Sequence, residues 1–264
     1  RWRLFKRSLT TLLSTFNYFL VQDEKTMKYL KKFGVSKDKF ELTGTLKEGA
    51  AALPYSEEDE KEMSKQIINR PIWLAASTHK GEEEIIAGAH KAASKASQGL
   101  LLIIVPRHPE RGVEIASYLK KNNFRVSLRS KNEKILQETQ IYIADTLGEL
   151  GLWYRLAPVS FLGGSLVNVG GHNPFEPAAL GSAILHGPYV HNFEEIYNRL
   201  SEANGAVRIN NESELSENLI KILSPDKAAR LAHAAWEVSS NGASVTDRAL
   251  ELIDENLAVG VQEC

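Results

Sequence analysis

Short apolar runs alternate with helix-like segments along most of this chain, and this alternation limits the folds that the chain can adopt. Several of the runs are nearly continuous, such as LLIIV at 101–105 and VSFL at 159–162. Continuous apolar runs are typical of strands that are buried on both faces of a parallel sheet. Strands that alternate with helices indicate βαβ units. The pattern therefore predicts an α/β fold with a parallel sheet.

The expected strands form two groups. Two strands, Tyr18–Gln22 and Lys39–Thr43, precede residue 50 and flank a helix at Glu24–Lys32. The other strands are expected at Ile72–Ser77, Leu100–Pro106, Arg125–Leu128, Gln140–Ala144, Val159–Leu162, Ala183–His186 and Ala206–Ile209.

The helical spacing of apolar residues from Ser213 to Leu257 predicts a helical cap after the last strand. The sequence thus predicts the remnant of one domain over 1–48, a linker and first helix over 49–70, and a Rossmann-like domain over 71–264. Because the chain opens at Arg1 without an initiator Met or a signal-peptide pattern, we expect a fragment.

Composition excludes several classes of protein. The net charge of −1 gives little attraction for a polyanion, so nucleic acid is not an expected partner. The single cysteine, Cys264, excludes an internal disulfide and a cysteine-based zinc site, and it suits a reducing compartment. The longest apolar run, Leu100–Pro106, is too short to cross a bilayer.

Ligands of open α/β sheets bind beyond the carboxyl ends of the strands, where this sequence has unusual loops. After the first main strand, Ser77, Thr78 and His79 precede an acidic helix start that could hold an anion, although a capped helix explains the pattern equally well. In the next loop two prolines stiffen the chain and display Arg107, which can bind a phosphate, a carboxylate or a base edge. An ordinary surface loop is the alternative there.

A third loop runs from Asp145 to Glu149. The spacing of Thr146 and Glu149 fits a capping box, so helix capping alone can account for both residues. The backbone amides of Leu147, Gly148 and Glu149 are nevertheless expected at the ligand edge of the sheet.

The fourth loop, Gly163–Gly181, is the most specific. Asn173 as N-cap and Pro174 at the first helical position form an ordinary helix start, in which the Glu176 carboxylate could accept both hydroxyls of a ribose. Helix capping does not explain the preceding glycines at 163, 164, 170 and 171, which suggest close approach of the backbone to a ligand.

Other site chemistries are not expected. The sequence has no Asp-x-Asp motif in a strand-end loop and no second ligand at a suitable spacing from His108, so we predict no metal and no cofactor. The first main strand is not followed by G-x-G-x-x-G, which disfavours an NAD-dependent dehydrogenase.

Five motifs in one order resemble the 3-deoxy-D-manno-octulosonic acid (Kdo) transferases of lipopolysaccharide synthesis. The motifs are STHKGEE, PRHPER, DTLGELGLWYRLA, FLGGSL and GGHNPFEPAALG. The resemblance covers the whole chain and implies a GT-B glycosyltransferase, which has two Rossmann-like domains with the active site between them. This chain would be the C-terminal, donor-binding half.

The resemblance also implies roles for individual residues. Lys47, in TGTLK, would stabilise charge on the departing phosphate, although Thr45 and Lys80 stand where the family usually has Asn and Glu. Contacts with the CMP portion of CMP-Kdo are implied for Pro106, Arg107, Leu147, Gly148, Glu149, Asn173, Pro174, Phe175 and Glu176. Further contacts with the phosphate or Kdo are expected at Ser77, Thr78, His79, Gly163 and Gly164.

The implied reaction is an inverting transfer of Kdo from CMP-Kdo to a lipid A precursor at the cytoplasmic face of the bacterial inner membrane. The resemblance places the carboxylate base and the peripheral membrane contact in the N-terminal half, so this chain alone is expected to bind nucleotide without turnover. The alternatives are a GT-B transferase or epimerase that uses a UDP-sugar, and a nucleotide-binding module without catalysis.

Overall fold

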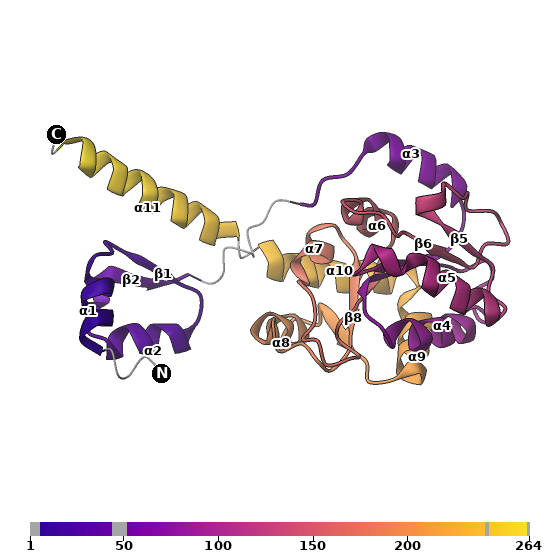
Figure 1. Ribbon diagram of the computed structural model, residues 1–264, viewed down its shortest axis with the longest axis horizontal. Helices are drawn as coiled ribbons and strands as arrows, with labels where there is room; N and C mark the ends of the chain where they lie inside the picture. Colours follow the sequence, from indigo (N-terminus) through magenta and orange to yellow (C-terminus); the bar gives the residue numbers. More distant parts are fainter. Residues whose placement is uncertain (1–5, 44–51, 241–242, 263–264) are drawn as a thin grey trace. The chain divides into compact units, whose positions relative to one another are not determined.

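The computed structural model describes residues 6–43, 52–240 and 243–262. The chain divides into two compact units (Figure 1). The larger unit spans residues 52–238, and the smaller unit combines residues of 1–51 with residues of 239–264.

The larger unit is built on a seven-stranded parallel sheet. Its strands are β3 (Ile72–Thr78), β4 (Leu101–Pro106), β5 (Val126–Leu128), β6 (Ile141–Ile143), β7 (Val159–Leu162), β8 (Ala183–His186) and β9 (Ala206–Arg208). They lie in the order β5-β6-β4-β3-β7-β8-β9. The predicted parallel sheet is confirmed, and each predicted strand agrees with an observed one to within a residue at either end.

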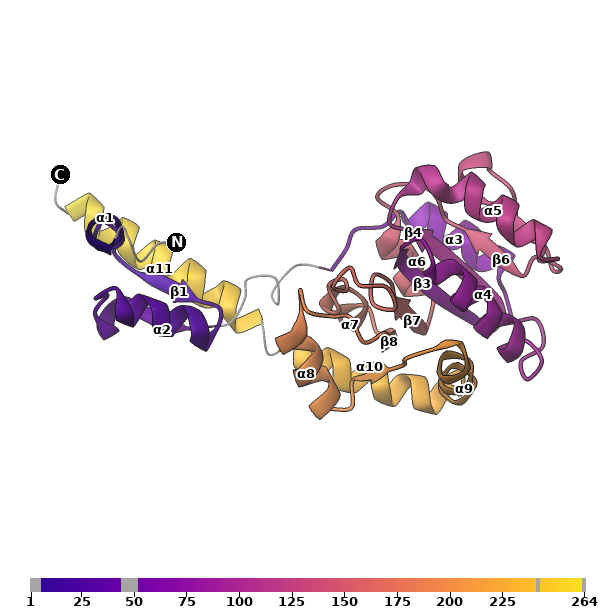
Figure 2. The ribbon, with the colours of Figure 1, turned by 60° about the horizontal axis from the view of Figure 1, so that its bottom comes forward.

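Helices cover both faces of this sheet (Figure 2). One face packs against α4 (Glu82–Ala93), α5 (Gly112–Lys121) and α9 (Glu212–Ile222). The other face packs against α3 (Glu57–Gln66), α6 (Leu150–Leu156), α7 (Phe175–Ala179) and α8 (Glu194–Glu202). The last helix of the unit, α10 (Pro225–Ser240), contributes residues to both clusters.

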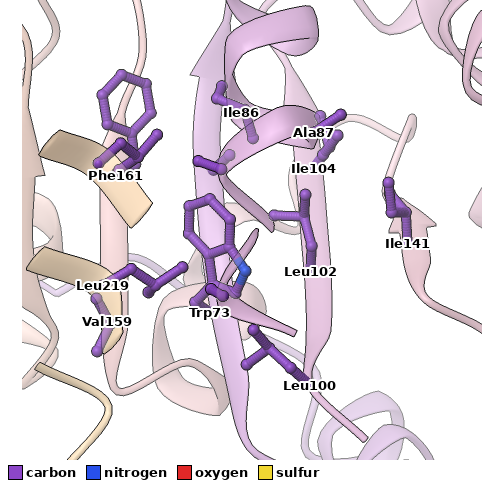
Figure 3. Packing of buried hydrophobic residues seen from close by; sticks show 14 of the residues in the cluster. Trp73, Ile86, Ala87, Leu100, Leu102, Ile104, Ile141, Val159, Phe161 and Leu219 are labelled. Carbon is purple, nitrogen blue, oxygen red and sulfur yellow. The ribbon is translucent and has the colours of Figure 1, made fainter. Parts of the chain in front are cut away.

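The alternation of side chains along β3 divides the core in two. Trp73 and Ala75 point into the cluster that holds α4, while Leu74 and Ala76 point into the cluster that holds α6. Figure 3 shows Trp73 against Leu102 of β4 and side chains of the neighbouring strands. Trp73 Nε1 donates a hydrogen bond to His90 Nδ1 over 3.1 Å, so the one polar atom of this side chain has a partner. Burial of each large apolar side chain stabilises the fold by about 1.5–3 kcal/mol.

The start of the larger unit differs from the predicted boundary at residue 71. Met63 and Ile67 are buried in the α6 cluster, and Gln66 Oε1 accepts a hydrogen bond of 2.8 Å from the Ile135 amide. The acidic run predicts a solvated helix in this segment; the helix is present as α3, but its apolar residues complete the core of this unit.

The smaller unit contains a parallel pair of short strands, β1 (Phe19–Val21) and β2 (Phe40–Leu42). The helix α2 (Glu24–Lys32) and the 3₁₀ turn Lys37–Lys39 connect the two strands, and the bounds of α2 match the predicted helix. The helix α1 (Lys6–Ser14) precedes β1. The C-terminal helix α11 (Ala243–Gln262) was expected in the helical cap of the larger unit. It instead groups with the smaller unit, where Arg248 Nε forms an ion pair of 3.1 Å with Glu41 of β2.

None of the described helices combines the length and apolar character that crossing a membrane requires.

Candidate functional site

The candidate site lies at the carboxyl edge of the sheet, around the point where the strand order reverses. Chain connections proceed from β3 to β4 on one side and continue from β7 to β8 on the other, so β3 and β7 lie side by side at the reversal. In open α/β sheets ligands bind in the crevice at such a point. The loops after these two strands are therefore the walls of the candidate site.

The sequence-predicted residues fall on this edge as expected. The structure places Ser77 and Thr78 at the end of β3 with His79 next, Pro106 at the end of β4 with Arg107 next, Leu147, Gly148 and Glu149 between β6 and α6, Gly163 and Gly164 directly after β7, and Asn173, Pro174, Phe175 and Glu176 at the start of α7. Lys47 and Thr45 lie outside the described residues.

A β-bulge re-aims the end of β3. The register with β4 shifts between Ala76 and Thr78, and Ser77 has a φ of +56°, in the left-handed region that a serine rarely adopts. The buried Thr78 hydroxyl donates to Glu83 Oε1 over 3.0 Å. The Thr78 carbonyl accepts a 3.0 Å hydrogen bond from the Arg107 amide, which joins the first and second candidate loops.

Arg107 itself is exposed. Its neighbour on the next turn, Arg111, forms a bidentate ion pair with Glu83 at 2.8 and 3.2 Å. The Arg111 charge is therefore neutralised by Glu83, while Arg107 is exposed to solvent at the candidate site.

The glycine-rich loop after β7 binds an anion, but the anion is a side chain of the protein. The fully buried Glu82 carboxylate accepts hydrogen bonds from the amides of Gly164, Ser165 and Leu166 at 2.7 to 3.1 Å, and from the His79 amide at 2.9 Å. Burial raises the pKa of Glu82, and the backbone hydrogen bonds offset part of that rise. Of the two alternatives for this helix start, an internal acceptor accounts for the His79 amide.

Packing accounts for both glycines at the end of β7. A side chain at Gly163 would place its Cβ 2.4 Å from the Ser77 carbonyl oxygen, and Gly164 has a φ of +64°. The Gly163 amide donates to Ala76 over 2.8 Å, and the Gly164 carbonyl accepts from Gly170 and Gly171. Because both amides donate within the protein, a contact of Gly163 or Gly164 with a ligand would have to use other atoms.

Two histidines meet between the loops of β3 and β7. His79 Nε2 and His172 Nε2 lie 3.0 Å apart, and their rings stack with an interplanar angle of 11°. His108 contacts the His79 ring edge-on, with 6.0 Å between centroids. Desolvation lowers the pKa of His79, as do the charges of His108 and Arg107, while Glu83 opposes them. Desolvation with the His79 and Arg107 charges lowers the pKa of His172 to about 4. Both rings are therefore neutral at pH 7.

The third candidate loop is anchored by hydrogen bonds from an arginine side chain. Arg129 donates to both carboxylate oxygens of Glu149 at 2.8 to 3.2 Å and to Asp59 of α3 at 2.6 Å. The predicted capping box is wrong, because α6 begins at Leu150 and Thr146 donates to the Glu149 side chain rather than accepting a backbone amide. Leu147 is 82% exposed, so the tip of this loop projects into solvent.

The start of α7 forms the last part of the site. The helix begins at Phe175, one residue later than predicted, so Pro174 occupies the cap position. Asn173 Oδ1 still accepts a 3.1 Å hydrogen bond from the Phe175 amide, which is the hydrogen bond expected of a capping side chain. Burial raises the pKa of the half-buried Glu176 carboxyl, and the Asn173 side chain opposes that rise.

Sequence reasoning missed three residues that organise the site: Glu82, Arg129 and His172. The sequence indicates only that Glu82 belongs to an acidic first turn, and the order of the strands brings it to the loop after β7. His172 belongs to the GGHNPFE motif. Its position between two glycines and the helix cap Asn173 could have marked it as a site residue. Across the described ranges, no group of three His, Cys, Asp or Glu side chains could hold a metal ion.

The chain is similar in sequence to known transferases. The chain is 36% identical over 263 residues to a 3-deoxy-D-manno-octulosonic acid transferase of Haemophilus influenzae, covering 96% of this chain and 60% of that protein. It is 30% identical over 259 residues to the corresponding transferase of Rickettsia felis, of which it covers 55%. The chain thus spans somewhat more than half the length of these relatives. No protein-family model matches it.

A solved structure extends the likeness to three dimensions. The C-terminal CMP-Kdo binding domain of WaaA from Acinetobacter baumannii is 31% identical, with a TM-score of 0.62, over 72% of this chain and 96% of that domain. A glycosyltransferase from Rickettsia africae, at 15% identity and a TM-score of 0.58, shares the fold alone. The chain belongs to the 3-deoxy-D-manno-octulosonic acid transferase family of GT-B glycosyltransferases.

Proposed function

We propose that this chain is the donor-binding part of an inverting glycosyltransferase, which transfers Kdo from CMP-Kdo to a lipid A precursor. The observation that carries the proposal is the likeness to the CMP-Kdo binding domain of A. baumannii, which extends over 96% of that domain. The carboxyl edge of the sheet supports it, because the loops there carry an exposed cation, Arg107, and a half-buried carboxylate, Glu176.

The proposed donor contacts divide by chemistry. Glu176 accepts hydrogen bonds from the ribose hydroxyls, Arg107 pairs with the phosphate, and the exposed Leu147–Glu149 loop covers the base through its backbone. Arg129 supports that loop through the Glu149 carboxylate. Residues 173–175 set the start of α7 and hence the position of Glu176.

In the proposed reaction, an acceptor hydroxyl oxygen bonds to the anomeric carbon of Kdo while the bond from that carbon to the phosphate oxygen breaks. The hydroxyl proton passes to a carboxylate base, and CMP leaves with the bonding electrons. Lys47 stabilises the charge that develops on the departing phosphate. The base belongs to the N-terminal half of the enzyme, as does the surface that contacts the lipid at the cytoplasmic face of the inner membrane.

Calorimetric titration of this chain with CMP, UMP and NADH tests the proposal. We expect CMP to bind, UMP to bind at least about tenfold more weakly because its base edge presents different donors and acceptors, and NADH not to bind. Preferential binding of UMP would support a UDP-sugar enzyme instead. Absence of binding to all three would contradict a donor site carried by these residues.

A further inference from the structure

The way in which Glu82 fills the glycine-rich loop affects where the donor phosphate can bind. In many nucleotide-binding folds, backbone amides of a glycine-rich loop cradle the phosphate. Here the amides of Gly164, Ser165 and Leu166 already donate to the Glu82 carboxylate, at 2.7 to 3.1 Å. A second anion at these amides would meet a buried carboxylate that is hydrogen bonded to the same groups. These three amides are therefore not open to the donor phosphate, and the groups beside the loop become candidates for binding it.

The His79–His172 pair lies beside that loop. Its two rings come from the loops that flank the reversal of strand order, and Nε2 of each ring is hydrogen bonded to the other over 3.0 Å. In such a contact one ring donates its Nε2–H and the other accepts it, so each ring keeps one Nδ1 for another partner. His79 directly follows Thr78, whose carbonyl accepts the Arg107 amide, and the Arg107 charge acts on both rings. If Arg107 pairs with the donor phosphate as proposed, that phosphate lies close to the pair.

The charges around the pair come from several elements. They are Glu82 and Glu83 of α4, and Arg107, His108 and Arg111 after β4. The neutral Tyr197 hydroxyl of α8 donates to the His172 carbonyl over 2.9 Å. Glu83 is neutralised by Arg111 and Glu82 by backbone amides, while Arg107 is the charged group common to both rings. The unliganded site therefore disfavours a charged imidazole.

We propose that the His79–His172 pair binds the phosphodiester of the CMP-sugar donor and takes up one proton when it does so. The inference rests on the proposed function. The added proton enters at an Nδ1, so that the protonated ring keeps its Nε2–H···Nε2 hydrogen bond to the other ring and the pair carries a single positive charge. A second proton would place two N–H groups face to face over 3.0 Å, which limits uptake to one.

This mode of binding has a functional consequence. The empty site carries no excess positive charge from the pair, and the cation forms when the anion arrives, because a nearby negative charge favours the protonated imidazole. When the sugar is transferred, the same proton remains beside the departing phosphate. His79 and His172 are thus binding residues for the phosphate in addition to Arg107.

The test uses the methyl ester of CMP, a phosphodiester with one negative charge, because the second pKa of a phosphate monoester is about 6 and would itself contribute protons. Cytidine, which lacks the phosphate, is the matched ligand. Titrations of the full chain at pH 6.5 in buffers of different ionisation enthalpy count the protons taken up. We expect uptake of about 0.5 to 1 proton per ester bound and none with cytidine.

A double variant of the pair gives the second measurement. In the double variant His79→Gln/His172→Gln, proton uptake should vanish and affinity for the ester should fall about tenfold at pH 6.5, since a hydrogen bond to a charged group is lost. Cytidine affinity should stay within about twofold of wild type, which also shows that the variant is folded. His233→Gln, an exposed histidine of α10, should change neither quantity.

Two results would overturn the inference. The first is that wild-type protein binds the ester without proton uptake, and the second is that the double variant keeps both uptake and affinity. Either result would show that the pair does not receive the phosphate. Binding of cytidine and CMP would still leave the proposed function intact. Failure of wild-type protein to bind cytidine, CMP or the ester would overturn the proposed function together with this inference.

Discussion

At the scale of single residues, Glu176 is the side chain whose chemistry the proposed function tests most directly. Glu176→Gln keeps the hydrogen bond from the Phe175 amide to Asn173 but replaces one acceptor oxygen by a donor. We expect CMP affinity to fall about 10- to 100-fold, because hydrogen bonds to a charged acceptor contribute about 1.5–3 kcal/mol. Calorimetry measures this change.

The matched ligand for this prediction is 2′,3′-dideoxy-CMP, which lacks both hydroxyls. Wild type and Glu176→Gln should bind this ligand with equal affinity. The control variant is Glu194→Gln, which changes an exposed residue of α8 and should bind CMP like wild type. Unchanged CMP affinity in a folded Glu176→Gln protein would remove the ribose role from this residue.

At the scale of elements, one side chain of α4 organises the loop that follows β7. Glu82 accepts four backbone amides, three of which belong to residues more than 80 positions away. In Glu82→Gln the side-chain NH₂ group would face amide donors, leaving buried N–H groups without acceptors. We expect the free energy of unfolding to fall by about 2–4 kcal/mol, measured by urea denaturation.

The control lies on the same helix. Glu84→Gln alters an exposed carboxylate of the same first turn, so it should change stability by less than about 0.5 kcal/mol. Equal effects of the two substitutions would mean that the helix dipole, rather than the contact between α4 and the loop, dominates at this position.

At the scale of the whole molecule, buried neutral histidines make stability depend on pH. Desolvation lowers the pKa of His90 and of His186 to about 4, and both side chains are nearly inaccessible. The unfolded chain binds protons at these residues below about pH 6.5, while the folded protein does not until about pH 4. The free energy of unfolding therefore decreases as the pH falls through that window.

Between pH 7 and pH 5, we expect each of these histidines to contribute on the order of 1 to 2 kcal/mol of that decrease. Urea denaturation followed by tryptophan fluorescence reports mainly on the larger unit, which holds Trp73, Trp153 and Trp236. His186→Gln should reduce the difference between the two pH values, and exposed His233→Gln should not. A difference that is the same in both variants would contradict this assignment.

The strands and most of their bounds follow from the sequence, because burial on both faces favours nearly continuous apolar runs and this pattern is local. The start of α7 was nearly as predictable, since Asn173 acts on an amide two residues away. The boundary at residue 71 was wrong for the opposite reason. Met63 and Ile67 are apolar residues in an acidic helix, and only the packing of α3 against α6 shows that they belong to the core.

The sequence by itself determined the parallel α/β architecture, the glycine-rich loop and the residues at the carboxyl ends of the strands. Only the tertiary structure decided that Glu82 fills the amides of that loop and that His79 contacts His172, 93 residues later in the chain. These contacts depend on the placement of β3 beside β7, which no local pattern encodes. The order of strands in the sheet selects which of the expected polar groups meet, and so decides the chemistry of the site.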